Sequence, residues 1–323
     1  MKLRPLCLLV LAAMLLSKPG YAQTPYPPET RNAALRYWLA FADLEDPPAD
    51  KPTQDLLEKV AAGEASWDER LGSILDLNEP AILAMQRATK LPDCDWGLEY
   101  SAGVRASIAY SPRARVLARL NTAYGMRLVA KGDLERAVDT WLAGIRFSRD
   151  LSKGGPVIFA LIARSILLPN LRALTQATRS GALGASQRKQ IEAAVRALPE
   201  TAFDWSEAVR LEEAGLYSFL DQTAAAPNPS EYYASVMGSP APKDFSVPSA
   251  ADRAAYHQVM LSAQAELRHS PVTAARKLAA LEGQIGRMPW LIQQVSPSLT
   301  RTNQARLEIA SARDELLTAL GTR

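Results

Sequence analysis

Acidic side chains are the one kind of catalytic group that this sequence supplies in quantity. Cleavage of a glycosidic bond needs two carboxyl groups that face the same bond. Two segments, 93–99 and 204–213, hold the candidates, which are Asp93, Asp95, Glu99, Asp204, Glu207, Glu212 and Glu213. A carboxylate-dependent hydrolase acting on cell-wall glycan is therefore one hypothesis. It requires one acid from each segment to stand about 5–10 Å from the other in a cleft.

The same acids also have a structural interpretation. Residues 91–96 and 198–205, which overlap the two segments, both run from Leu-Pro to Asp-Trp, with Asp95 before Trp96 and Asp204 before Trp205. An Asp at the start of a helix accepts the free N–H groups of the first turn, while the following Trp packs inward. Glu207 stands three residues after Asp204, which is the spacing of a capping box. We expect capping to be the main role of these carboxylates.

No other catalytic motif is evident in the sequence. His257 and His269 are too far apart to form the pair of histidines one helical turn apart that a zinc peptidase uses. Cys94 is flanked by Asp93 and Asp95, whose negative charges raise the pKa of a thiol and make it a poor nucleophile. The chain has no Gly-x-Ser-x-Gly elbow, phosphate-binding glycine loop or dinucleotide-binding Gly-x-Gly-x-x-Gly. We therefore predict no catalytic, cofactor-binding or metal-binding residue.

Charge is distributed unevenly along the chain. Residues 41–99 hold 14 acidic and 5 basic residues, whereas residues 100–198 hold 5 acidic and 16 basic residues. Four arginines of the basic segment are spaced to share one broad helix surface, namely Arg113, Arg115, Arg119 and Arg127. Such a surface would suit an anion-binding groove for an acidic peptide, a glycan or a lipid headgroup. Alternatively, the acidic segment packs near the basic one and neutralises it, or both are solvated faces.

The first 22 residues have the layout of a secretory signal peptide. Lys2 and Arg4 precede an apolar run from Leu6 to Leu16, and a short segment ending at Ala22 follows. The run is about half the length that a membrane span requires. We therefore predict cleavage after Ala22, export to the periplasm or the cell exterior, and no membrane span in the mature chain.

Removal of this segment neutralises the chain. The whole sequence carries 37 basic and 34 acidic residues, and its first 22 residues contribute three basic residues and no acidic one. The mature chain is therefore balanced at 34 of each, and Cys94 is its one cysteine. Because it is neutral, exported and without a recognised nucleic-acid module, we expect no nucleic-acid partner.

Composition and periodicity predict an all-α protein. The chain contains 54 Ala and 44 Leu among 323 residues, and both residue types favour helices. Apolar residues recur at helical spacing, and no stretch alternates in the manner of a strand. We expect about ten helices stacked as antiparallel pairs after the signal peptide. One of them is expected to start at Asn78, and another to form a buried core helix over 157–180.

Three regions follow the signal peptide. Residues 23–224 are expected to form a helical domain, and residues 250–323 a C-terminal helical region. Between them, residues 225–249 hold five prolines among Ser, Asn and Gly, which predicts a long irregular loop or linker. The sequence leaves open whether this segment is a lid over a site or a linker between domains.

The helical hairpin at 112–151 resembles a tetratricopeptide-type repeat. The resemblance rests on an order of small and large residues, and the matching positions are Gly125, Gly132, Ala137, Trp141, Gly144 and Ile145. The sequence departs from the motif at Asn121, Leu128 and Arg149, where the repeat has Trp, Tyr and Pro. No second copy lies one repeat length of about 34 residues away. The resemblance implies stacked helix pairs and, in that family, peptide or protein binding, but no reaction.

We therefore predict an exported, non-enzymatic helical scaffold that binds a protein or peptide partner in the cell envelope. The candidate binding residues are Arg113, Arg115, Arg119, Arg127 and Trp141. The hypothesis requires a concave groove lined by residues of 112–151, in which arginines and Trp141 are accessible. The glycan hydrolase is the alternative, and the sequence identifies neither the ligand nor the oligomeric state.

Overall fold

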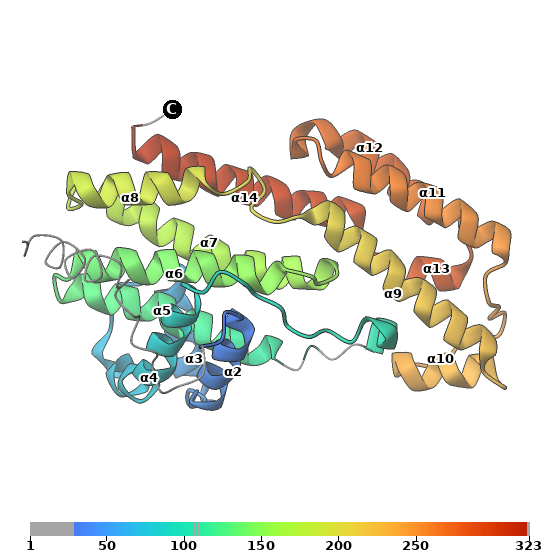
Figure 1. Cartoon of the computed structure of the whole chain (residues 1–323), viewed down its shortest axis with the longest axis horizontal. Helices are drawn as coiled ribbons and strands as arrows, with labels where there is room; N and C mark the ends of the chain where they lie inside the picture. Colours follow the sequence, from blue (N-terminus) through green and yellow to red (C-terminus); the bar gives the residue numbers. More distant parts are fainter. Residues whose placement is uncertain (1–28, 106–107, 109, 322–323) are drawn as a thin grey trace, which may run out of the picture. The chain divides into compact units, whose positions relative to one another are not determined.

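The computed structural model describes residues 29–105, 108 and 110–321, and Asn32–Arg323 form one compact unit (Figure 1). Within the described part, all regular structure is helical, and strand-like pairing is limited to an isolated bridge between Asn32 and Asp93. The prediction of an all-α protein is therefore confirmed. The elements are α2 (Ala33–Ala42), α3 (Lys51–Ala62), η1 (Glu69–Leu71), α4 (Gly72–Ala88), η2 (Tyr100–Arg105), α5 (Ser111–Ala130), α6 (Leu134–Ser152), α7 (Val157–Arg179), α8 (Ala185–Arg196), α9 (Trp205–Ala225), α10 (Pro229–Met237), α11 (Ala250–Glu266), α12 (Pro271–Ile285), α13 (Trp290–Val295) and α14 (Leu299–Ala319).

Helices α5, α6 and α7 pack side by side (Figure 1). The hairpin expected over 112–151 is formed by α5 and α6, and the core helix expected over 157–180 is α7. Gly132, with a φ of 80°, allows the tight turn between α5 and α6, and Asp133 caps α6 by accepting the N–H of Arg136. α7 is long and apolar enough to cross a membrane, but 67% of its apolar stretch is buried inside the protein.

Two glycines allow these three helices to approach one another closely. A Cβ atom at Gly125 of α5 would lie 2.3 Å from Nε1 of Trp141 of α6. A Cβ atom at Gly144 of α6 would lie 2.4 Å from Oδ1 of Asn170 of α7. Both distances are far below van der Waals contact, so only glycine fits at these positions. The large side chains fill the space that the glycines leave.

A polar network joins α4 to the α5–α6 hairpin. Asn121, which stands where the tetratricopeptide motif has Trp, is fully buried. Its amide donates to the carbonyl oxygen of Thr140 at 2.9 Å, and its Oδ1 accepts from Nε2 of Gln86 at 3.0 Å. Buried amides require such partners, so this departure from the motif serves the attachment of α4.

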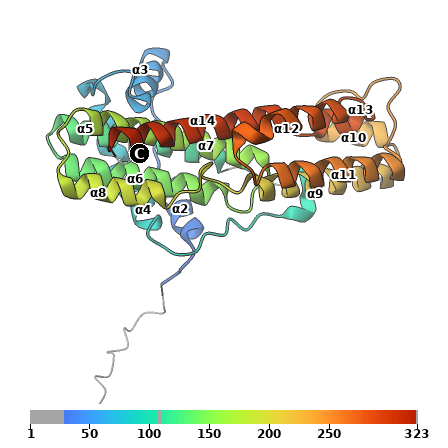
Figure 2. The ribbon, with the colours of Figure 1, turned by 90° about the horizontal axis from the view of Figure 1, so that it is seen from above.

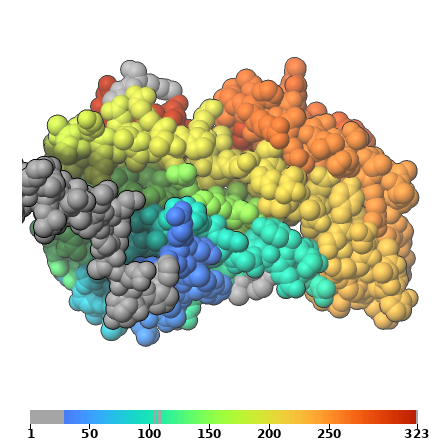
Figure 3. All heavy atoms as spheres, in the orientation of Figure 1, coloured from blue at the N-terminus to red at the C-terminus, as the bar shows by residue number. Residues whose placement is uncertain are grey.

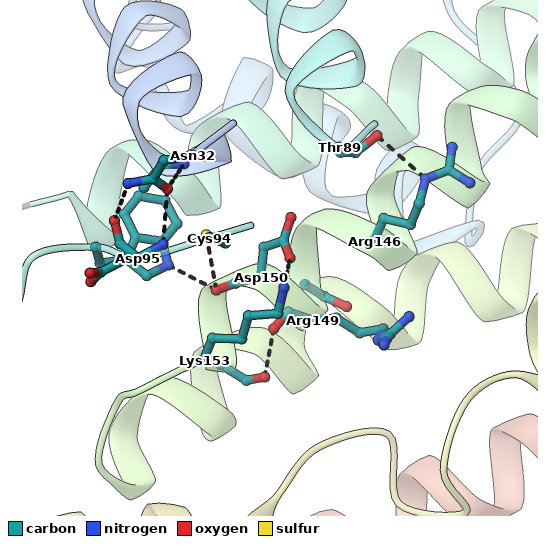
Figure 4. A network of polar contacts seen from close by, with 12 residues as sticks. Asn32, Thr89, Cys94, Asp95, Arg146, Arg149, Asp150 and Lys153 are labelled. Carbon is teal, nitrogen blue, oxygen red and sulfur yellow. Dashed lines mark hydrogen bonds and ion pairs between the residues drawn. The ribbon is translucent and has the colours of Figure 1, made fainter. Parts of the chain in front are cut away.

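Helix α2 docks on the central helices through a cluster of aromatic rings. The rings in mutual contact are Tyr37, Phe41, Trp96, Tyr110 and Phe147. At one end of this cluster, the Tyr37 hydroxyl donates to Oδ2 of Asp150 at 2.7 Å, and Lys153 pairs with Oδ1 of the same carboxylate at 2.8 Å (Figure 4). The buried carboxylate is therefore satisfied on both oxygens.

The helix expected to start at Asn78 instead starts at Gly72 and continues to Ala88 as α4. Asn78 lies buried inside it, donating to the carbonyl oxygen of Ile74 and accepting the N–H of Glu45. The prediction was wrong because an Asn side chain can satisfy a backbone group of a distant segment as well as the first turn of its own helix.

Helices α9, α11, α12 and α14 form the other part of the unit (Figure 2). α9 packs on α11, α11 on α12 and α12 on α14, and α14 returns to α7. The irregular connection expected over 225–249 contains a helix, α10, whose first turn is capped by Asn228 and opened by Pro229. The helices on both sides of this segment belong to the same compact unit.

A buried arginine holds α14 to the end of α11. Arg306 is 1% exposed, and its guanidinium donates to the carbonyl oxygens of Leu267 and His269 and to Oδ1 of Asn303. Burial lowers the pKa of Arg306 to about 10, so the side chain stays charged at neutral pH. A cation at the carbonyl end of a helix satisfies backbone acceptors that the helix itself leaves open.

Substitution of Gly125 by Ala tests the close approach of α5 and α6. We expect Gly125→Ala to lower the free energy of unfolding by about 1–3 kcal/mol, because the added methyl group overpacks against Trp141. Gly283→Ala is the matched control, since Gly283 lies in helix α12 with open space around its Cα, and it should be neutral or stabilising. Equal effects of the two substitutions in urea denaturation would contradict the packing described above.

Removal of the Arg306 guanidinium tests its capping role. We expect Arg306→Met to cost about 2 kcal/mol of the free energy of unfolding, because carbonyl oxygens at the end of α11 lose their buried donor. Arg276→Met, at an exposed position of α12, should change this free energy by less than about 0.5 kcal/mol. A negligible loss for Arg306→Met in chemical denaturation would show that the guanidinium does not stabilise the α11–α14 contact.

Candidate functional site

A groove of about 800 Å³ lies between α3, α5, α7 and α14. α7 packs against both α5 and α14, and α3 packs on α5 (Figure 2). α7 contributes six residues to the lining of the groove, more than any of the other three helices, and this part of the lining is here called the floor. The apolar part of the lining consists of Ala61, Ala62, Ala118, Ile158, Leu161, Ile166, Pro169 and Ala305. A volume of this size falls within the range of sites that bind small molecules.

Four arginines line the same groove together with two glutamates. Arg115 and Arg119 come from α5, one turn apart, while Arg164 comes from α7 and Arg301 from α14. The glutamates are Glu58 of α3 and Glu308 of α14. The formal charge of the lining is therefore positive, in contrast to the neutral mature chain expected from the sequence.

The four arginines differ in their partners. Arg164 forms an ion pair with Glu308. Arg115, Arg119 and Arg301 form no ion pair with any described residue. The Nε atoms of Arg119 and Arg164 are buried and have no hydrogen-bond acceptor within the described part of the chain. Burial, together with the charges of Arg172 and Arg301, lowers the pKa of Arg164. The groove therefore contains more guanidinium groups than carboxylates to pair with them.

The structure divides the four arginines that the sequence places on one surface. Arg115 and Arg119 line the groove. Arg113 instead donates to the carbonyl oxygen of Leu44 at 2.7 Å and lies 3.8 Å from a carboxylate oxygen of Asp46. Neutralisation by the acidic segment therefore accounts for Arg113, whereas Arg115 and Arg119 have no acidic partner among the described residues.

Arg127 belongs with the neutralised arginines. Its Nη1 lies 2.6 Å from a carboxylate oxygen of Asp76, and its guanidinium lies over the ring of Trp67 at 5.8 Å. Both partners come from the acidic segment 41–99. Arg127 therefore holds α5 to the N-terminal helices and does not line the groove.

Trp141 does not lie in the groove, so the expectation that it is accessible is wrong. Its side chain is 1% exposed, and its Nε1 donates to the carbonyl oxygen of Thr122 at 3.3 Å. The physical reason is the hole left by Gly125, which the indole fills from α6. A large aromatic residue opposite a glycine is more stable as a packing element than as an exposed contact.

Sequence reasoning missed half of the groove arginines, namely Arg164 and Arg301. Arg164 interrupts the apolar first half of α7, which was the available signal of a special position. Arg301 lies in the last helix, more than 100 residues away along the sequence. Only the packing of α14 on α7 brings it to the groove.

Several acids of the two segments are engaged in structural contacts. Asp95 accepts the N–H of Gly97 in a loop rather than capping a helix. Residues 100–105, which form η2, pack on α9, and Figure 3 shows this teal segment against the yellow helix. Ser218 and Gln222 of α9 donate to the carbonyl oxygen of Ser101. Asp204 caps α9 as expected by accepting the N–H of Glu207. The expected capping box is not completed, because the Glu207 carboxylate accepts hydrogen bonds from Arg210 instead of the backbone N–H of Asp204. These bonds from Arg210 lower the pKa of Glu207.

The next two acids of α9 hold neighbouring helices. Glu212 accepts the N–H of Val157 at 2.9 Å, so it caps α7, whose N-cap residue is a proline without a side-chain acceptor. Burial raises the pKa of Glu212, and the bond from Val157 opposes this shift. Glu213 is buried, and its Oε1 lies within hydrogen-bond distance of Nδ1 of His257, at 2.6 Å. Its Oε2 accepts a hydrogen bond from Nε2 of Gln264 at 3.2 Å. None of these carboxylates lines the groove.

Cys94 lies close to the buried Asp150 (Figure 4). Its Sγ is 3.8 Å from the carbonyl oxygen of Asp150. Burial raises the pKa of the Cys94 thiol to about 12, and the Asp150 charge adds to the shift more than the neighbouring Asp95 does. The thiol is therefore protonated at neutral pH and is a poor nucleophile. Among the described residues, no three His, Cys, Asp or Glu side chains gather as metal ligands.

Comparisons with known proteins give no relative for this chain. No family model, no curated protein and no solved structure matches it.

Substitution of Glu212 by Gln tests the burial of this carboxyl group. Because the folded state raises the pKa of Glu212 above its ordinary value of 4.5, the folded state binds this proton more tightly than the unfolded state. The resulting stabilisation is present below pH 4.5 and is lost as the pH rises through the raised pKa. We therefore expect Glu212→Gln to become more stable relative to the unsubstituted protein between pH 4 and pH 8 in urea denaturation. A difference that does not change with pH would contradict the burial of a titrating carboxyl group.

Proposed function

We propose that this chain is an exported, non-enzymatic helical scaffold that binds a peptide segment of a protein partner in the cell envelope. The observation that carries the proposal is the groove between α3, α5, α7 and α14, with an apolar floor and arginines that have no carboxylate partner. Apolar area supplies affinity, and a few placed polar groups supply orientation, in most ligand sites.

The hairpin of α5 and α6 supports a tetratricopeptide-like stacking of helix pairs. The side chain of Trp141 of α6 packs against Gly125 of α5, and the side chain of Asn170 of α7 packs against Gly144 of α6. Successive helices related in this way form a layer with one curved face, and peptide binding on that face is common in helical repeats. The groove uses the residues of α5 that point away from α6, such as Arg115 and Arg119.

Export is part of the proposal and rests on residues 1–22, which lie outside the described residues. Their positive start, short apolar run and small residue at Ala22 are the features of a cleaved signal. The extensive burial of α7 supports a mature chain without a membrane span, because α7 is the described helix with sufficient length and hydropathy. N-terminal sequencing of the protein from a periplasmic or culture fraction should begin at Gln23.

The glycan hydrolase is less well supported. The carboxylates of Asp204, Glu207, Glu212 and Glu213 already bind backbone N–H groups or cationic and amide side chains. The groove contains Glu58 and Glu308, but Glu308 is paired with Arg164. A carboxylate held by a guanidinium group is not available to donate a proton to a glycosidic oxygen.

Blocking the groove tests the proposed binding function. Ser165 is an exposed residue of α7 that lines the groove, so Ser165→Trp should fill the groove without disturbing the core. We expect the tagged wild-type protein to capture one specific partner from envelope extract, identified by mass spectrometry, and Ser165→Trp to lose at least about 10-fold in captured partner.

The matched control is Ala275→Trp, which adds an indole at an exposed position of α12 outside the groove. It should capture the partner as the wild type does. Retention of the partner by Ser165→Trp, or capture of none by the wild type, would refute binding in the groove.

A further inference from the structure

The ion pair between Arg164 and Glu308 lies within the lining of the groove. Resting on the proposed function, we propose that the groove selects an acidic peptide segment with apolar side chains, one carboxylate of which replaces Glu308 at Arg164. Glu308 would then compete with the ligand carboxylate for Arg164, and its negative charge would lower the affinity of the groove for acidic ligands.

The first argument is the surplus of cationic side chains. The lining holds four arginines against two glutamates, and one of the glutamates is engaged with Arg164. Guanidinium groups bind carboxylates with two parallel hydrogen bonds, and Arg115, Arg119 and Arg301 form no ion pair with any described residue. A ligand with several carboxylates would pair with these guanidinium groups.

The second argument is the placement of the arginines on both sides of an apolar floor. Arg115 and Arg119 lie on α5, while Arg301 lies on α14, and α7 packs between these helices with Ile158 and Leu161 in the lining. A lipid presents one charged headgroup at one end of an apolar body. An acidic peptide presents charges along its length, with apolar side chains between them, so it matches both walls and the floor.

The third argument concerns the electrostatic position of Arg164. Its guanidinium is 29% exposed and lies near the charges of Arg172 and Arg301, so a single carboxylate is needed to balance it. Glu308 supplies this carboxylate while also accepting a hydrogen bond from Gln304 at 3.3 Å. A ligand carboxylate at Arg164 preserves the charge balance and releases Glu308 toward solvent, where it is already 35% exposed. The exchange therefore costs little desolvation.

The test uses three soluble peptides built from Leu and Ala with Glu, Gln or Lys at the same positions, and measures binding by calorimetry to the mature protein. We expect the Glu peptide to bind at least about 10-fold more tightly than the Gln peptide, with an affinity that falls as salt is raised. The Lys peptide should not bind, because it faces like charges.

Two variants in the groove separate the roles of its charges. Arg301→Gln, at an exposed position, should weaken binding of the Glu peptide by about 5- to 10-fold, because one cation is lost. Glu308→Gln should strengthen binding by a similar factor, because the competing carboxylate is gone. Arg276→Gln, outside the groove, should leave the affinity unchanged. Circular dichroism checks that each variant is folded, and Glu308→Ala serves as a second test of the competition.

Several results would overturn the inference. These are equal binding of the Glu and Gln peptides, no binding of the Glu peptide at millimolar concentration, unchanged or weaker binding by both folded Glu308 variants, and binding of anionic phospholipid vesicles in preference to the peptide. The groove-blocking test with Ser165→Trp does not depend on ligand charge. If Ser165→Trp loses the captured partner but the Glu and Gln peptides bind equally, the selectivity for acidic ligands is refuted and the proposed function is retained.

Discussion

The fold depends on how closely α5, α6 and α7 approach one another. Gly125 and Gly144 remove the side chains that would hold these helices apart, and Trp141 and Asn170 occupy the resulting space. The other helices build on this layer, with α4 joined through Asn121, α9 through the bond from Val157 to Glu212, and α14 along α7. If the three helices were more widely spaced, α7 would no longer provide one surface to both α5 and α14, and the groove would change its shape.

The same packing determines which charges are satisfied. The acidic segment 41–99 supplies Asp46 and Asp76, which pair with Arg113 and Arg127 of α5. Arg115 and Arg119 instead line the groove, where α3 contributes Glu58 and where Arg164 and Arg301 add to the positive charge. Cationic side chains without partners cost free energy in a half-buried groove, and an anionic ligand would recover it. The uneven charge distribution of the sequence thus corresponds to a contact between the acidic segment and α5 and to the positively charged lining of the proposed binding groove.

Much of the fold could be predicted from the sequence, but only part of the site. Glycine and proline positions define the ends of α5, α6 and α7, and apolar periodicity defines their buried faces, so these local features were predictable. Asn78 and Trp141 were misjudged because their roles depend on partners from other helices, Glu45 and Gly125. Arg301 was not predictable at all, since it reaches the groove through tertiary packing between helices far apart in the chain.

The central claim is that the groove contacts a protein partner, and photo-crosslinking in the cell tests it most directly. A photoreactive phenylalanine analogue in place of Gln304, an exposed residue of the groove, should form a covalent adduct of defined mass with one partner protein. The same analogue at Ala275, outside the groove, should form none. Adducts of equal yield from both positions, or adducts from Ala275 alone, would contradict the account.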